Sequence, residues 1–371
     1  MRWFYRSLPI RCGALALVAG LSITACGGDR PQSNRPSAAE GAPEAIASGC
    51  RTVSHFSGET EVCESPEKIV VLDAHSLDLL LSLGRQPAGI VTPLPITTDR
   101  VEQPSVAVPY LGNFVTTKPV YLGTAGRAPS LEVLTLLRPD LILGESWSVR
   151  SASEVLLPKV APTVPLGPRT EKNQWRRNLR AMAQALGDEN LANQAIARYE
   201  QQLAKAKKDL AEVVAQRPKV LLLTGESLTK GAIFILTGEG FIGQMLQAIG
   251  FEVVTPPGVT QNFIPSSVEV LPSLNEADMV FVLGYSAEAS EAVEAEDIID
   301  EKALVERQNF LIGQQLARIK ADWGENAIAQ SLTASKTDQV YFRTFYEWNV
   351  FNGPLGAELI LTQLRESLLE E

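Results

Sequence analysis

Apolar residues recur at alternating spacings of four and three residues between Glu189 and Gln216, a stretch without proline or glycine. This periodicity places all of them on one face of a helix. At ~1.5 Å per residue such a helix spans roughly 42 Å, which is long for one compact domain. We therefore predict a helix that connects two domains; a coiled coil or an ordinary surface helix is the alternative. The apolar positions are Ala192, Ile196, Tyr199, Leu203, Ala206, Leu210 and Val213.

A shorter amphipathic helix is predicted just before it, with Trp175, Leu179, Met182 and Leu186 on one face. Gly187-Asp188 is typical of a helix end followed by a capping residue.

The pattern before these helices alternates between short apolar strands and helices. KIVVLD (68–73) predicts a strand, SLDLLLSLG (76–84) a helix and PAGIV (87–91) a second strand. After a long loop from Thr92 to Pro119, Ser130 opens a capped helix that Pro139 ends, and DLILG (140–144) is the next strand. Strand, helix and strand in this order indicate a parallel sheet. Trp147 and Arg150 follow the last strand, at the end of a parallel sheet where ligands bind.

The second half of the chain repeats this order. We predict strands at 219–223, 251–255 and 339–342, a strand or hairpin at 231–238, helices at 240–250 and 355–369, helical stretches up to Leu332, and an aromatic loop at 343–354. The acidic segment Ser286–Glu301 is predicted to be a solvated helix or loop. PSLEVLTLLRPDLILG (129–144) and SSVEVLPSLNEADMVFVLG (266–284) share the pattern Ser-x-Glu-Val-Leu, and each continues into an apolar strand. This internal repeat indicates two related lobes and makes Glu132 and Glu269 equivalent.

The first residues have the features of an export signal. Three arginines, Arg2, Arg6 and Arg11, precede an apolar run. This run, Cys12 to Ile23, is too short to span a bilayer. Small residues before Cys26 look like a bacterial lipobox, which predicts a signal peptide over 1–25 and a lipid on Cys26; a plain signal peptide is the alternative. Residues 26–48 are rich in Gly, Pro, Ser and Ala and predict a flexible tether.

Cys50 and Cys63 remain in an exported, oxidising compartment, where they form either a bridge across a strand-turn-strand segment with Gly58 at the turn or two free thiols. Loss of the three signal arginines makes the formal net charge of −10 more negative by three. With no basic patch, nucleic acid is not an expected partner.

Little in the sequence favours catalysis. GEGFIG (238–243) has the spacing of a dinucleotide-binding loop but lacks the acid that should follow about twenty residues later. With only His55 and His75, the chain has too few soft ligands to predict a transition-metal site, and it has no recognisable Ser, His and acid arrangement. Aromatic rings and arginines do gather at predicted strand ends, which suits a bulky, polar, partly anionic ligand between the lobes. They are Trp147, Arg150, Tyr285, Arg343, Tyr346 and Trp348.

Taken in order, several segments resemble the periplasmic siderophore-binding family, the substrate-binding lipoproteins of ABC importers. They are PEKIVVLDAHSLDLLLSLGRQPAGI, PSLEVLTLLRPDLILGE, LPKVAPTVPL with the following W-x3-L helix, SSVEVLPSLNEADMVFV, and QVYFRTFYEW with GPLGAELIL. The GCRTVSHFSGET start is similar to the ferric citrate and hydroxamate branch. The resemblance implies an α/β fold with two Rossmann-like lobes, 49–170 and 218–371, joined through 171–217 by a long rigid helix, with a shallow cleft and little closing motion.

The resemblance also implies partners and site residues. A ferric siderophore would bind between the lobes, with its iron held by the siderophore and no protein cofactor, and Glu132 and Glu269 would dock onto arginines of the ABC permease. An acid early in a helix also simply favours the positive end of the helix dipole, which is the alternative for both. The implied ligand contacts are Asn113, Ser146, Trp147, Phe241, Asn262, Phe263, Tyr285, Arg343, Tyr346 and Trp348.

Some members carry arginines where this chain has Tyr285 and Gly240, so a hydroxamate or citrate-type complex is expected rather than a catecholate. Cobalamin or haem is the alternative cargo, and an extracytoplasmic enzyme or scaffold of the same fold is the alternative function. We expect an exported monomer held at a membrane by its lipid.

Overall fold

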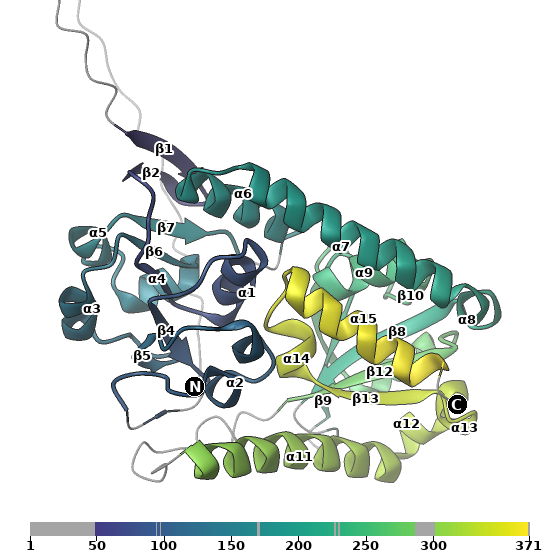
Figure 1. Cartoon of the computed structure of the whole chain (residues 1–371). Coiled ribbons are helices and arrows are strands. Elements are labelled where there is room, and N and C mark those ends of the chain that lie inside the picture. Colours follow the sequence, from purple (N-terminus) through teal and green to yellow (C-terminus); the bar gives the residue numbers. More distant parts are fainter. Residues whose placement is uncertain are drawn as a thin grey trace, which may run out of the picture. The chain divides into compact units, whose positions relative to one another are not determined.

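The computed structural model describes residues 49–369 except 94, 97, 169–170, 226–227, 229–230 and 286–300. The described residues belong to one compact unit (Figure 1). The expected signal peptide, the lipidation residue Cys26, the tether and nearly all of the acidic segment 286–301 lie outside them.

A disulfide-closed hairpin begins the N-terminal lobe. β1 (Cys50–His55) pairs antiparallel with β2 (Gly58–Cys63), and Gly58 has a φ of 135°, which favours glycine at this turn. Cys50 and Cys63 face each other in the register and form a disulfide, so the predicted bridge is confirmed and the alternative of free thiols is wrong.

The N-terminal lobe is built on a five-stranded parallel sheet, as the alternating pattern predicted. Alternate strand residues point to opposite faces, so Ile69 and Val71 pack under α1 and α6 while Val70 and Leu72 pack under α3, α4 and α5. In sheet order the strands are β5 (Val120–Thr124), β4 (Gly89–Thr92), β3 (Ile69–Val71), β6 (Leu141–Glu145) and β7 (Thr163–Leu166). The helices are α1 (Ala74–Ser82), α2 (Pro104–Ala107), η1 (Leu111–Phe114), α3 (Leu131–Leu137), α4 (Ser146–Ala152) and α5 (Leu157–Val160).

The C-terminal lobe has a mixed sheet in which β9 alone runs antiparallel to its neighbours. Its order is β11 (Phe263–Ser267), β9 (Ala232–Leu236), β8 (Lys219–Gly225), β12 (Met279–Gly284) and β13 (Val340–Thr344), and β10 (Glu252–Val253) also pairs with β8. The helices are α9 (Phe241–Ile249), η3 (Val268–Leu274), α11 (Glu301–Glu325), α12 (Ala327–Ser331), α13 (Thr333–Lys336), α14 (Phe345–Asn349) and α15 (Pro354–Leu369).

Three local predictions differ from the structure. The second copy of the repeat forms the 3₁₀ helix η3 rather than an α-helix, because Pro272 lies inside it and cannot donate a backbone hydrogen bond. The expected aromatic loop at 343–354 contains α14, which Thr344 caps by accepting a hydrogen bond from the Glu347 amide. The long loop from Thr92 to Pro119 contains α2 and η1.

The helices between the lobes follow the predicted apolar face but not the predicted length. α6 (Gln174–Leu186) ends at Gly187, and α7 (Asn190–Asp209) is followed by a separate α8 (Ala211–Gln216). The chain leaves helical geometry at Leu210, where φ is −96° and ψ is 5°, although that side chain stays fully buried. The expected single helix is therefore broken in its last third.

The C-terminal helix α15 joins the two lobes, since it packs against α1 as well as α7 (Figure 1). The buried Asp78 carboxylate of α1 accepts hydrogen bonds from the backbone amides of Leu355 (3.0 Å) and Gly356 (2.8 Å) in the first turn of α15. A negative charge at a helix N-terminus satisfies amides that the helix itself cannot.

His75, three residues before Asp78 in α1, makes further buried hydrogen bonds to Asn178 and Phe351. Its Nε2 accepts from the Asn178 amide nitrogen at 3.2 Å, so Nδ1 carries the proton that is donated to the Phe351 carbonyl oxygen. These hydrogen bonds and the shared apolar core fix the orientation of the lobes.

Candidate functional site

The carboxyl ends of the parallel strands define one edge of each sheet, and several of the predicted site residues lie directly after such strand ends. In the N-terminal lobe Ser146 and Trp147 follow β6 directly, and in the C-terminal lobe Tyr285 follows β12 while Tyr346 follows β13. Ligands of open parallel sheets bind outside such edges.

A line of aromatic rings connects loops from both lobes. Phe114 contacts Tyr110 with ring centroids 5.4 Å apart, Tyr110 stacks on Phe351 at 6.0 Å, and Phe351 meets Tyr346 at 5.2 Å. The Tyr110 hydroxyl also donates to the Leu355 carbonyl oxygen. The loop after β13 is therefore held against the loop of the N-terminal lobe that carries Asn113, whose side chain is exposed.

Two buried acids at the carboxyl edge of the N-terminal sheet were not among the predicted site residues. Asp73 follows β3, and its carboxylate accepts from the amide and hydroxyl of Ser76 and from the Glu145 amide at 2.7 Å. Glu145 ends β6, is 1% exposed and accepts from the Trp147 indole nitrogen at 2.9 Å. An acid directly after an apolar strand, as in VVLD and LILGE, is the signal that could have found both.

The pKa of Asp73 is raised, first by burial and then by the charge of the Glu145 carboxylate. The folded state thus keeps this proton to a higher pH than the unfolded chain does. The contribution of Asp73 to stability is complete below the unfolded value of about 4 and is lost as pH rises through the raised folded value.

Replacing Glu145 by Gln should make this loss of stability smaller. The variant removes one charge that raises the Asp73 pKa, while its amide oxygen can still accept from Trp147. Urea unfolding at pH 4, 5.5 and 7 should show a variant that gains stability relative to wild type as pH rises, by about 1.4 kcal/mol for each unit of pKa change. The exposed Glu189→Gln is the control, and parallel stability curves for Glu145→Gln and wild type would refute the coupling.

The predicted residues of the C-terminal lobe lie at different levels of its sheet, since Tyr285 follows the carboxyl end of β12, whereas Phe263 begins β11 and pairs with Leu236, which is opposite Leu222 in the middle of β8. Tyr285 is 43% exposed and meets Phe345 edge-on at 5.6 Å, and the half-buried Phe263 stacks on Phe234 at 4.5 Å. Asn262 is half-buried, and its carbonyl accepts from the Thr237 amide. Phe241 begins α9 but is only 8% exposed, with its ring 6.2 Å from Trp175 of α6.

Two predicted residues point into the lobe instead. Trp348 is fully buried, stacks on Phe281 and donates to the Gln363 side chain at 2.6 Å. Arg343 lies within β13 and its guanidinium donates to carbonyl and hydroxyl oxygens of Phe342, Gln363 and Ser367, of which the last two belong to α15. Burial lowers the pKa of Arg343. The resemblance implied a ligand contact for both residues, but in this structure both side chains support the packing of α15.

Glu132 and Glu269 occupy equivalent, exposed positions. Each lies two residues after a serine whose hydroxyl caps the following turn: Ser130 accepts from the Val133 amide and Ser267 from the Glu269 amide, both at 3.3 Å. β11 runs in the same direction as β8 and β12, so η3 starts at the carboxyl edge of its sheet just as α3 does. Both acids therefore lie beside the carboxyl edge of their sheets.

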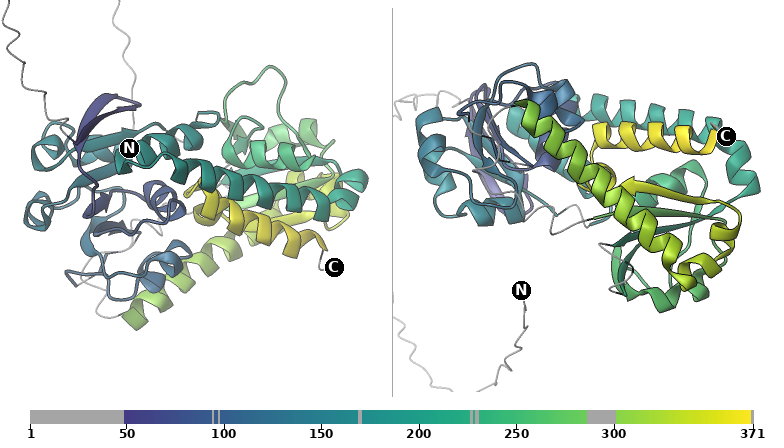
Figure 2. Two further views of the ribbon diagram at one scale, coloured as in Figure 1. Left: turned by 45° about the horizontal axis from the view of Figure 1, so that its top comes forward. Right: turned by 90° about the horizontal axis from the view of Figure 1, so that it is seen from below.

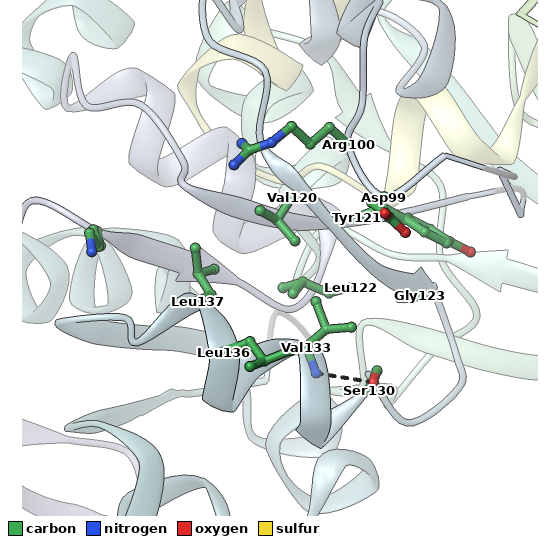
Figure 3. A pocket seen from close by; sticks show the side chains of 11 residues that line it. Asp99, Arg100, Val120, Tyr121, Leu122, Gly123, Ser130, Val133, Leu136 and Leu137 are labelled. Carbon is green, nitrogen blue, oxygen red and sulfur yellow. Dashed lines mark hydrogen bonds between the residues drawn. The ribbon is translucent and has the colours of Figure 1, made fainter.

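Two grooves are lined by described residues of the N-terminal lobe, the hairpin and α6. One of 720 Å³ follows the outer side of β5 and is walled by Val133, Leu136 and Leu137 of α3, with Asp99 and Arg100 opposite (Figure 3). Another of 320 Å³ lies between the tip of the hairpin and the start of α6, next to His55 and Arg177. The Arg177 guanidinium donates hydrogen bonds to the side chains of Gln174 and Glu171 and to the Lys172 carbonyl oxygen.

Metal-ligand chemistry within the described residues is limited to one group, Cys50, Glu61 and Cys63, whose sulfurs form the disulfide. Both histidines use their two ring nitrogens in hydrogen bonds, His75 as described and His55 with the Thr60 hydroxyl and the Ser57 amide. Neither ring offers a nitrogen to a haem iron in this arrangement. Among the described helices, none is both long and apolar enough to cross a membrane.

Comparison with known proteins identifies the family. A model of the periplasmic binding protein family matches residues 69–344. The Fe(3+)-citrate-binding protein YfmC of Bacillus subtilis is 24% identical, and the match covers 95% of each chain. The crystal structure of Staphylococcus aureus SirA complexed with staphyloferrin B has a TM-score of 0.63 and 24% identity, covering 86% of this chain and 98% of that one.

Bacillus subtilis FeuA complexed with ferri-bacillibactin has a TM-score of 0.60 and 20% identity, covering 86% and 99% of the two chains. These matches confirm the expected fold of two α/β lobes. The chain thus belongs to the periplasmic binding protein family and is a binding protein rather than an enzyme.

Proposed function

We propose that this protein is the extracytoplasmic substrate-binding lipoprotein of an ABC importer, and that it captures a ferric siderophore of the hydroxamate or citrate type between its lobes. The observation that carries the proposal is the pair of carboxyl edges joined by aromatic rings, with one exposed, equivalent acid beside each. The names of YfmC, a Fe(3+)-citrate-binding protein, and of the Fe(3+) dicitrate-binding FecB of Escherichia coli support the cargo.

The ligand would contact rings and small polar groups rather than a shell of metal ligands. Tyr285 and Trp147 offer partly exposed ring surface, and Ser146, Asn113 and Asn262 offer hydrogen bonds to chelator oxygens. Iron would stay inside its chelator, because neither histidine has a free ring nitrogen and the paired cysteines form a disulfide. Phe263 and Tyr346 complete the proposed set of ligand contacts. Phe241, Arg343 and Trp348 would support these residues through packing and hydrogen bonds instead of contacting the ligand.

Calorimetric titration of the fragment from residue 48 onward tests the proposal. The panel comprises ferric dicitrate, a ferric trihydroxamate, a ferric catecholate, the iron-free chelators, cobalamin and haem. Tight binding of a ferric hydroxamate or citrate complex, with weak binding of its iron-free form, is the expected result. If only cobalamin or haem bound, the cargo would be that compound and not a ferric siderophore. The absence of any binding would overturn the receptor function.

The anchor is proposed from the sequence, where Ile23-Thr24-Ala25 precede Cys26 and a tether of small residues follows. A lipid on Cys26 would hold the protein at the outer face of a membrane. A Cys26→Ser variant expressed with its signal should appear in the soluble extracytoplasmic fraction, whereas wild type should sediment with membranes. Equal partition of the two would exclude the lipid.

A further inference from the structure

The internal repeat shows that one connection in the C-terminal lobe is enlarged. β6 and β7 are adjacent parallel strands, as are β12 and β13, and the first strand of each pair ends the repeated segment. Residues 146–162 suffice to connect β6 with β7, whereas residues 285–339 connect β12 with β13. The enlarged connection contains α11, a helix of 25 residues with no counterpart in the N-terminal lobe.

The C-terminal half of α11 belongs to the C-terminal lobe. Ile319 and Trp323 are buried in the core under β8 and β12, and the Trp323 indole donates to the Ser335 hydroxyl at 3.1 Å. A Cβ on Gly284, at the end of β12, would lie 3.1 Å from the Gln315 carbonyl oxygen. α11 therefore passes directly over the carboxyl edge of this sheet.

The N-terminal half of α11 reaches the other lobe. It contacts α2, and Leu304 is 2% exposed within the same buried cluster as Ala107 of α2. Leu304 and Ile319 are separated by roughly 22 Å along the helix at ~1.5 Å per residue. Figures 1 and 2 show α11 extending from the C-terminal sheet to α2 on the side away from α6 and α7. The helix thus bridges both lobes opposite the linking helices.

Gln308 lies between the two anchoring points. It follows Leu304 by one turn, on the same side of the helix. Its side-chain nitrogen is buried from solvent and has no hydrogen-bond partner among the described residues. A buried donor without a partner is costly, so such a group in a native structure requires an explanation.

Other buried polar atoms without partners lie in segments that follow the carboxyl ends of β6 and β13. Among the described side chains these are the Ser148 hydroxyl in α4, the Tyr346 hydroxyl in α14 and the Asn352 oxygen between α14 and α15. Unpaired donors and acceptors on three elements that approach the edges from different sides are expected where a polar ligand supplies the missing partners.

We propose that residues 301–314 of α11 form a strap that closes the ligand site opposite the linking helices, and that the Gln308 amide donates a hydrogen bond to a chelator oxygen of the bound ferric complex. This proposal rests on the proposed function, because it takes the ligand to bind between the lobes. It adds a ligand contact on a helix that the repeat does not contain. A strap anchored on both lobes also limits ligand exchange.

Affinity measurements test the contact. Gln308→Leu removes the donor at similar volume, and Gln314→Leu makes the same change at an exposed position on the helix. For whichever of ferric dicitrate or ferric trihydroxamate binds wild type, Gln308→Leu should weaken binding on the order of tenfold and Gln314→Leu should not. Equal affinities of the two variants would refute the contact while leaving the proposed function intact. If neither complex bound wild type, the function and the Gln308 contact would both fail.

Hydrogen exchange tests the strap without any ligand. Leu304→Ser should increase amide exchange throughout residues 303–314 and in α2, because it places a hydroxyl in an apolar contact. The neighbouring Val305, which is 37% exposed, provides the control variant Val305→Ser. In stopped-flow binding, Leu304→Ser should also raise the rate of ligand release. Unchanged exchange in α2 and in the N-terminal half of α11 would overturn the strap, whatever the affinity results show.

Discussion

Replacing Glu132 and Glu269 together by alanine should abolish ligand-stimulated ATP hydrolysis by the permease proposed as the partner, while leaving ligand affinity unchanged. Both carboxylates are exposed, so neither supports the core. Removing one member of a charge pair that becomes buried at an interface costs about 2–5 kcal/mol. Loss of both pairs should therefore weaken the complex with the permease by roughly three to seven orders of magnitude.

The geometry explains why the two acids should act together. They begin the equivalent helices α3 and η3, each at the carboxyl edge of its sheet, so a single permease surface could meet one acid from each lobe. Docking would then depend on the lobe arrangement, which ligand binding can bias. Each single variant should retain partial stimulation, because the other lobe still docks.

A control of equal charge change is Glu189→Ala with Glu325→Ala, two exposed acids outside the repeat. This control should stimulate the permease as wild type does. Equal loss in the control would mean that net charge, rather than position, drives docking. Loss of ligand affinity in Glu132→Ala with Glu269→Ala would show instead that the acids stabilise the edge loops through their helix termini.

The sequence was most informative where one periodicity dominates. Buried strands such as KIVVL and MVFVL have no competing pattern, and the repeat around Glu132 and Glu269 exposed the two-lobe organisation. Periodicity could not reveal the break at Leu210, because the apolar spacing continues through it while Leu210 stays buried. A change of backbone direction that preserves the buried face leaves no trace in the hydrophobic pattern.

Site residues were harder to predict, because position along a strand does not give the direction of a side chain. Arg343 and Trp348 lie close to Tyr346 in sequence, yet both face α15, whose packing could not be derived from local sequence. The same holds for Asp73, whose hydrogen bond to the Glu145 amide spans two strands. The reach of α11 to α2 likewise depends on a tertiary contact at Leu304.

Asp78 forms another such tertiary contact, and its replacement by Asn should be the most damaging single change at the joint between the lobes. The carboxylate uses both oxygens: Oδ1 accepts from the Leu355 amide and the Ser82 hydroxyl, and Oδ2 accepts from the Gly356 amide. An asparagine can present only one oxygen, so its NH₂ group would face a backbone N–H that then has no acceptor. An unsatisfied buried donor costs about 1–3 kcal/mol, and loss of the charge at the α15 N-terminus adds up to about 2 kcal/mol.

Burial acts in the opposite direction, since it raises the pKa of Asp78 and so disfavours the ionised form that asparagine would replace. The hydrogen bonds should outweigh this relief, because Asp78 is 0% exposed and solvent water therefore does not reach the position of the lost acceptor. We expect the free energy of unfolding to fall by about 2–4 kcal/mol in Asp78→Asn, measured by urea unfolding at pH 7. Ser82→Ala, which removes one hydrogen bond to the same oxygen, should cost only about 1 kcal/mol.

Hydrogen exchange should locate the damage of Asp78→Asn at the first turn of α15 and in α1, the two elements that join the lobes. Ligand affinity should fall as well, because a looser joint lowers the fraction of molecules in which the carboxyl edges are aligned. An Asp78→Asn variant as stable as wild type would mean that the carboxyl group is protonated at pH 7. The connection between the lobes would then rest on His75 and the shared apolar core rather than on a buried charge at the start of α15.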